Sequence, residues 1–73
     1  MVVYSGDLAK RLDKPHSDVK SLLKSYAQRG YKGVFRVYPS RRYYCSQQFI
    51  DNNYTDIMSN LNRVINVRLT TIT

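Results

Sequence analysis

Residues 15–28 read PHSDVKSLLKSYAQ, and this stretch decides the fold. Apolar residues recur in it at spacings of three and four, which is typical of a helix with one buried face. They are Val19, Leu22, Leu23 and Tyr26. Pro15 suits the first position of such a helix, and Gly30 suits the position just after its end. We therefore expect a helix that runs to about Arg29, with its basic residues on the opposite face.

A shorter helix is expected just before it, over about residues 6–13. Its apolar residues share one helical face, and Ser5 is the expected N-cap. These residues are Leu8, Ala9 and Leu12. Pro15 disfavours helical geometry at the residue before it, so the first helix ends there and a tight turn follows. Either Lys14 or Ser17 caps the second helix, and the pattern does not choose between them.

A β-hairpin is expected after Gly30. Residues 34–38 and 43–45 are rich in β-branched and aromatic side chains, and residues 39–42 between them read Pro-Ser-Arg-Arg. The hairpin therefore has a basic tip. Residues 2–4 are also β-favouring.

The last third of the chain favours one more helix, at about residues 55–65, where Ile57, Leu61, Val64 and Ile65 recur at helical spacing. Ser46 or Asn53 is the candidate cap. Residues 67–72 alternate and are β-branched, which predicts a terminal strand, with a frayed tail as the alternative.

This order of elements is the pattern of a winged helix-turn-helix: two short helices, a β-hairpin wing and a C-terminal helix. The expected fold class is α+β, and 73 residues make a single domain over residues 1–73. A chain this short buries only about 60% of the surface that its unfolded form exposes. Such a thin core favours a homodimer, and the uncharged stripe from Ile57 to Ile65 is the expected contact.

Positive charge is concentrated in the first part of the chain. The net charge is +7, and residues 1–42 hold ten Lys or Arg against three Asp, whereas residues 43–73 hold two of each sign. A focused positive field attracts polyanions, and the release of counterions from phosphates supplies affinity. Double-stranded DNA is therefore the expected partner.

The candidate DNA contacts follow from the expected fold. An α-helix fits the major groove, and a basic hairpin tip reaches phosphates or the adjacent minor groove. The candidates are His16, Ser17, Lys20, Ser21 and Lys24 on the second helix, Arg41 and Arg42 at the hairpin tip, and Lys10, Arg11 and Lys14 beside the first helix. Arg29, Lys32 and Arg36 are weaker candidates. Lys20 and Lys24 are spaced i, i+4, so they project from one face.

Two short motifs resemble the N-terminal domain of the Rha family of phage regulatory proteins. They are Ser5-Gly6-Asp7-Leu8-Ala9 and Lys14-Pro15-His16-Ser17-Asp18-Val19, with a Lys-x-His-x-x-Val element in the second. The Tyr43-Tyr44 strand that leads to Ser46 and Phe49 is also similar to that family's pattern. The resemblance implies a winged-helix fold and a transcriptional regulator of phage or prophage type, which acts in the cytoplasm of a bacterial cell or a phage-infected host.

An enzyme is not expected. The chain has no Glu, its Asp residues are spread out, and none of its glycines forms a phosphate-binding loop. Cys45 and His16 fall in different elements, and Cys45 is expected to be a small buried side chain. We therefore expect no metal, no cofactor and no small-molecule substrate.

Two other functions fit the same residues. The +7 charge would also steer an acidic protein partner to a small inhibitor or adaptor. Tyr38 and Tyr43 flank the basic turn, and such aromatics stack the unpaired bases of RNA or single-stranded DNA. No signal peptide is seen, and no apolar run approaches the roughly 20 residues of a membrane span, so no membrane partner is expected.

Overall fold

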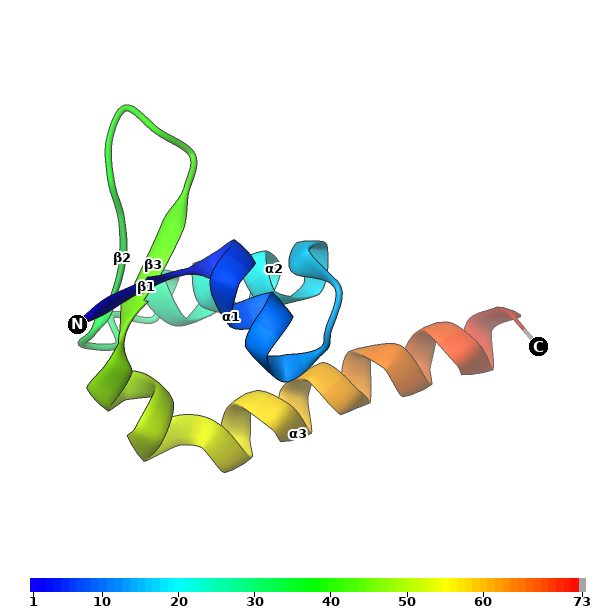
Figure 1. The fold of residues 1–73 in the computed structure, drawn as a ribbon. Helices are drawn as coiled ribbons and strands as arrows, with labels where there is room; N and C mark the ends of the chain where they lie inside the picture. The colour runs from blue at the N-terminus through cyan, green and yellow to red at the C-terminus, as the bar shows by residue number, and fades with distance from the viewer. Residues whose placement is uncertain (73) are drawn as a thin grey trace.

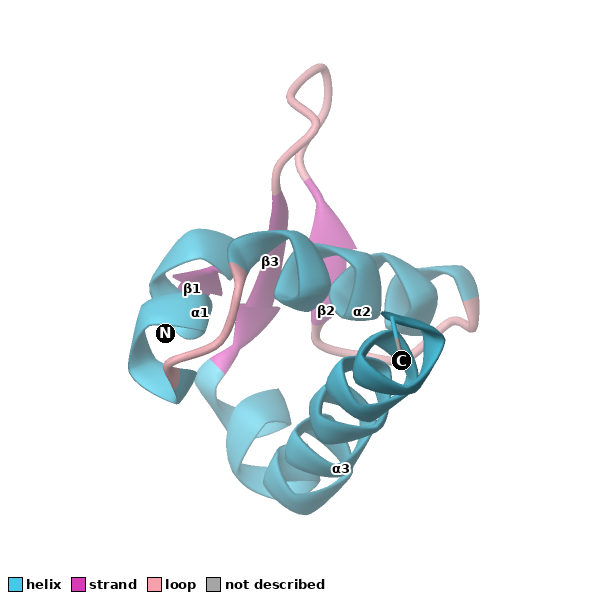
Figure 2. Cartoon of the chain, turned by 90° about the vertical axis from the view of Figure 1, so that its right-hand side faces the viewer, coloured by secondary structure: helices cyan, strands magenta, loops and turns pink. Residues whose placement is uncertain are grey.

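Three short strands form one antiparallel sheet, and three helices lie on one side of it (Figures 1 and 2). This computed structural model describes the backbone of residues 1–72 and the side chains of residues 1–63. The elements follow the order β1 (Val2–Tyr4), α1 (Ser5–Leu12), α2 (His16–Gln28), β2 (Val34–Arg36), β3 (Tyr43–Ser46) and α3 (Gln47–Ile72). The expected α+β class is confirmed.

Strand β3 is the centre of the sheet, in the order β1-β3-β2. Cys45 pairs with Val3 on one side and with Val34 on the other. All three side chains are buried, because alternate residues of a strand point to the same face and this face carries the helices. Cys45 is thus a small buried side chain, as expected, and burial raises the pKa of its thiol to about 11.

Helices α1 and α2 are joined by residues 13–15, as the sequence predicts, but their caps differ from the prediction. Ser5 is the first residue of α1 rather than its cap, and its fully buried hydroxyl bonds the His16 ring. Pro15 takes the N-cap position of α2, so neither Lys14 nor Ser17 caps it. The Pro15 carbonyl accepts the first backbone hydrogen bonds of α2.

Helix α3 is much longer than the predicted segment 55–65, since it runs over Gln47–Ile72 (Figure 1). It begins just after Ser46, whose hydroxyl accepts a 3.0 Å hydrogen bond from the Phe49 amide. Asn53 has non-helical backbone angles and marks a kink inside the helix rather than its start. Phe49 lies before this kink and is buried, which explains why the helix extends so far upstream.

The predicted strand over residues 67–72 is wrong, because these residues continue α3. A helix that already exists is extended at little cost, and β-branched residues lower helix stability only slightly. Among residues 1–72, no helix is long and apolar enough to cross a membrane.

The core lies between the sheet and the three helices and takes residues from every element. The side chains with the least exposure include Leu8, Val19, Leu23, Ile57 and Leu61. Ile57 and Leu61 are each 1% exposed, so half of the stripe expected to form a dimer contact packs inside the chain's own core. The other two residues of the stripe, Val64 and Ile65, lie outside the described side chains.

Candidate nucleic-acid interface

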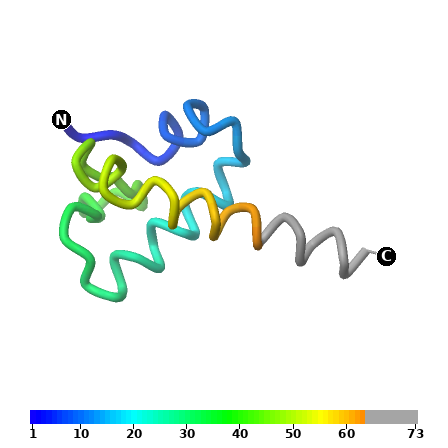
Figure 3. Tube along the Cα trace, turned by 90° about the horizontal axis from the view of Figure 1, so that it is seen from below, coloured from blue at the N-terminus to red at the C-terminus, as the bar shows by residue number. Residues whose placement is uncertain are grey.

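Helix α2 turns one face into the core and the opposite face outward. Val19 and Leu23 are fully buried, while Ser17, Ser21 and Lys24 are exposed. Helix α2 (cyan) is crossed by α3 (yellow to orange) in Figure 3, and it contacts α1 directly. Its polar face is therefore open to a partner.

A concavity of about 460 Å³ lies between α2 and the hairpin. We call it the basic concavity, and it is lined by Lys20, Lys24, Arg36, Arg41 and Tyr43. Four of these five side chains are cationic and none is acidic. Charges of one sign gathered in a concave surface reinforce each other's field, which favours a polyanion there.

The sheet register explains why the hairpin contributes to this concavity. Arg36 pairs with Tyr43, and both lie on the same sheet face as Val34 and Cys45. That face is the one covered by α2. Arg36 and Tyr43 lie two residues along their strands from the buried pair Val34 and Cys45, toward the hairpin loop. Their side chains therefore reach the surface beside the lysines of α2.

The loop over residues 37–42 projects from the body of the domain (Figures 1 and 2). The Arg36 Nε donates a 3.0 Å hydrogen bond to the Ser40 carbonyl, and its guanidinium carbon lies 4.5 Å from the centre of the Tyr38 ring. The Arg42 amide donates to the Ser40 hydroxyl at 3.0 Å. The loop is therefore held by its own side chains, with Arg41 exposed beside the basic concavity.

The predicted DNA contacts divide into two groups. Lys20, Lys24 and Arg41 come together in the basic concavity. Arg42 does not join them, because its guanidinium carbon lies 5.4 Å from the centre of the Tyr4 ring on the other sheet face. Ser21 borders a different groove, between α2 and α3.

Two of the three candidate cations beside α1 are held by α3. The Arg11 Nη1 donates to the Gln47 side chain at 2.8 Å, and the Lys14 Nζ donates to the Asn62 side chain at 3.0 Å. Lys10 is exposed on α1 and does not line the basic concavity.

His16 and Ser17 are exposed at the start of α2. The His16 Nε2 shares a 2.9 Å hydrogen bond with the buried Ser5 hydroxyl, and its ring meets the Tyr4 ring edge-on at 5.6 Å. His16 thus ties the start of α2 to the start of α1.

Sequence reasoning gave Arg36 only as one of the weaker candidate contacts. Its alternation with Val34 along the strand was the signal that could have found it, because it assigns both residues to the same sheet face. That signal needs the hairpin register, which residue types alone do not supply. Comparisons of the chain with models of protein families, with curated proteins and with solved structures find no match.

Proposed function

We propose that this domain is a winged helix-turn-helix that binds duplex DNA in a sequence-specific way. Helices α1 and α2 with the turn 13–15 form the helix-turn-helix, and the loop 37–42 is the wing. The strand order β1-β3-β2 supports this topology, and the hairpin lines the basic concavity together with Lys20 and Lys24 of α2. In this arrangement α2 enters the major groove and the wing lies against the adjoining backbone.

The observation that carries the proposal is the basic concavity. Lysines of the outward face of α2 and arginines of the hairpin line one surface, although they lie at least 12 positions apart in the sequence. In a duplex, the major groove is bordered by the phosphate backbone. A helix that enters the groove and a basic element beside it can therefore contact the base edges and the phosphates at the same time. Transcriptional regulation of phage or prophage type completes the proposal, supported by the resemblance of residues 5–26 to the Rha family.

Selection of bound fragments from random duplex DNA at physiological salt tests the proposal, because that salt suppresses non-specific attraction. We expect a defined sequence motif to emerge.

The double variant Lys20→Ala, Lys24→Ala should bind the selected duplex more weakly, with a salt slope shallower by about 0.9 for each phosphate that the variant no longer neutralises. Lys32→Ala is the control, because Lys32 is exposed but lies outside the basic concavity. Recovery of no motif, or equal weakening in the double variant and the control, would count against the proposal.

Binding of single-stranded nucleic acid is a second candidate, favoured by a row of aromatic rings. Tyr4 contacts Tyr44, and Tyr44 stacks on Phe35 with an interplanar angle of 16°, across all three strands. Phe35 is 40% exposed, on the sheet face that the helices leave uncovered. Of the two tyrosines that the sequence suggested, Tyr38 is exposed on the loop and Tyr43 lines the basic concavity.

Competition between duplex and single-stranded oligonucleotides at fixed salt separates the two candidates. The duplex proposal expects the selected duplex to displace the single strand. Tighter binding of the single strand, abolished in Phe35→Ala but kept in Lys20→Ala, would favour the aromatic row instead.

A further inference from the structure

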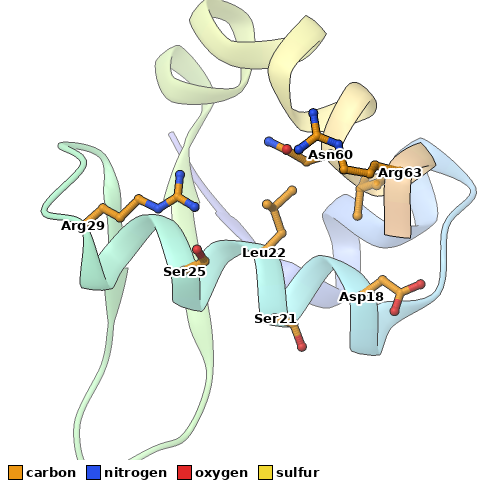
Figure 4. A pocket seen from close by; sticks show the side chains of 8 residues that line it. Asp18, Ser21, Leu22, Ser25, Arg29, Asn60 and Arg63 are labelled. Carbon is orange, nitrogen blue, oxygen red and sulfur yellow. The ribbon is translucent and has the colours of Figure 1, made fainter. Parts of the chain in front are cut away.

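A second groove runs along the other flank of α2, where α2 faces α3. Its volume is about 280 Å³, and it is lined by Ser21, Leu22 and Ser25 of α2 and by Asn60, Leu61 and Arg63 of α3. In Figure 4, Leu22 and Ser25 point toward α3, whereas Ser21 at the rim points away from it. Arg29, just after the end of α2, borders the groove as well. None of these residues belongs to the basic concavity.

The floor of this groove is apolar and its walls are fixed. Leu61 is 1% exposed and Leu22 is half-buried. The Asn60 side-chain amide donates a 3.0 Å hydrogen bond to the hydroxyl of buried Tyr26, which ties α3 to α2 at the groove. The Asn60 side-chain carbonyl, the Ser25 hydroxyl and Leu22 therefore present one mixed surface.

Two guanidinium groups give the groove its charge. Arg29 and Arg63 extend along it from opposite sides of Leu22 in Figure 4, one from each helix. Within the side chains of residues 1–63, neither guanidinium forms a hydrogen bond or an ion pair. Asp18 borders the groove too, but it is only 5% exposed and already takes part in another interaction.

From this chemistry we propose that the α2–α3 groove binds a small organic anion, one carboxylate on a compact apolar body. Ligand sites are mostly apolar with a few convergent polar groups, and a groove of about 280 Å³ is near the small end of their range. The apolar body lies on the exposed part of Leu22, and a guanidinium pairs with the carboxylate through two parallel hydrogen bonds.

The position of the groove gives the ligand a regulatory role, and this step rests on the proposed DNA binding. Ser21 lies on the outward face of α2, between the groove and the flank that carries Lys20 and Lys24. An anion wedged between α2 and α3 changes how α2 is held, and a ligand with different affinities for the free and DNA-bound forms shifts DNA binding.

Titration of the ¹⁵N-labelled full chain with phenylacetate, without DNA, tests the site itself. We expect saturable shifts at Ser21, Leu22, Ser25, Asn60 and Leu61, with a dissociation constant on the order of 1 mM. The neutral phenylacetamide should bind at least about tenfold more weakly, because it lacks the charge that the arginines recognise. The double variant Arg29→Ala, Arg63→Ala should no longer bind phenylacetate, while Lys20→Ala, Lys24→Ala should retain it.

Three results would overturn the proposal. They are no saturable shift up to about 10 mM phenylacetate, equal binding of the neutral amide, or shifts centred on the basic concavity. A separate experiment measures the salt slope of duplex binding by the Arg29→Ala, Arg63→Ala variant without phenylacetate. A slope shallower than that of the wild type would show that Arg29 and Arg63 contact the DNA backbone, and it would contradict the organic-anion site. Because the titration contains no DNA, its failure and a failure of DNA binding are distinguishable.

Discussion

At the scale of single residues, Gly33 lies where the chain entering the hairpin packs closely against the start of α3. Its backbone φ is +90°, and an added Cβ would lie 2.9 Å from the Ser46 hydroxyl and 3.1 Å from the Phe49 Cβ. Gly30 has a similar φ of +80° but open space around it, as the expected residue after the end of α2. A side chain at Gly30 would therefore meet backbone strain alone, whereas a side chain at Gly33 would meet both backbone strain and a steric clash.

Gly33→Ala should lower the free energy of unfolding by about 3 kcal/mol, and Gly30→Ala by about 1 kcal/mol. Both variants have the strain of a positive φ, but only Gly33→Ala also displaces Ser46 and Phe49. Urea denaturation followed by circular dichroism measures both values. Equal decreases in the two variants would show that the close approach of Gly33 to α3 contributes nothing.

Cys45 makes stability depend on pH in alkaline solution. Burial raises the pKa of its thiol from 9.0 to about 11, so the unfolded chain releases this proton at lower pH than the folded chain. The buried neutral thiol contributes its full stabilisation below pH 9, and this contribution is lost as the pH rises from 9 to about 11. The decrease is at most about 2–3 kcal/mol. Burial also raises the pKa of Tyr26, which adds to the fall at still higher pH.

Denaturation of the wild type and of Cys45→Ala over this pH range measures the effect. The variant should be less stable near neutral pH, because it leaves a small cavity, but its stability should fall less steeply above pH 9. Parallel curves for the two proteins would show that the thiol titrates as it does in the unfolded chain.

At the scale of elements, the hairpin separates two neighbouring arginines. Arg41 lines the basic concavity, whereas Arg42 lies against Tyr4 on the opposite sheet face. Arg41→Ala should therefore make the salt slope of duplex binding shallower by about 0.9, and Arg42→Ala should leave it nearly unchanged. Fluorescence anisotropy at several salt concentrations measures both slopes. A larger effect of Arg42→Ala would move the contact surface to the outer sheet face.

The elements that the sequence predicted best are those with a strong apolar period. The stripe Val19–Tyr26 located α2 to within a residue or two, and two runs rich in β-branched and aromatic residues located the hairpin. Helix α3 was harder, because Asn52 and Asn53 look like a break while buried Phe49 and Ile50 extend the helix beyond them. Propensity is a weak prior there, since packing against the core decides where a helix begins.

The candidate site was predictable only in part, for the same reason. The spacing of Lys20 and Lys24 assigns them to one helical face, which needs no tertiary information. The position of Arg36 depends on strand register, and the separation of Arg41 from Arg42 depends on which face each meets. The hydrogen bonds that hold Arg11 and Lys14 to α3 span 36 and 48 residues, beyond the reach of any local pattern.

At the scale of the whole molecule, the uneven distribution of charge along the chain corresponds to a difference in structural role. All five residues of the basic concavity come from the first 43 residues, where the positive charge is concentrated. Helix α3 carries few charges and contributes core residues such as Ile57 and Leu61. The neutral part of the chain therefore adds core residues, whereas four of the ten cations of the basic part gather in the basic concavity.

Mapping the selected duplex onto the protein by NMR is the most direct test of that surface. Amide and side-chain shifts on titration at physiological salt should cluster at Ser17, Lys20, Lys24, Arg41 and Tyr43, on α2 and the hairpin together. Shifts centred on Phe35 and Tyr44, with α2 unaffected, would contradict the claim that the helix and the hairpin form one duplex-binding face.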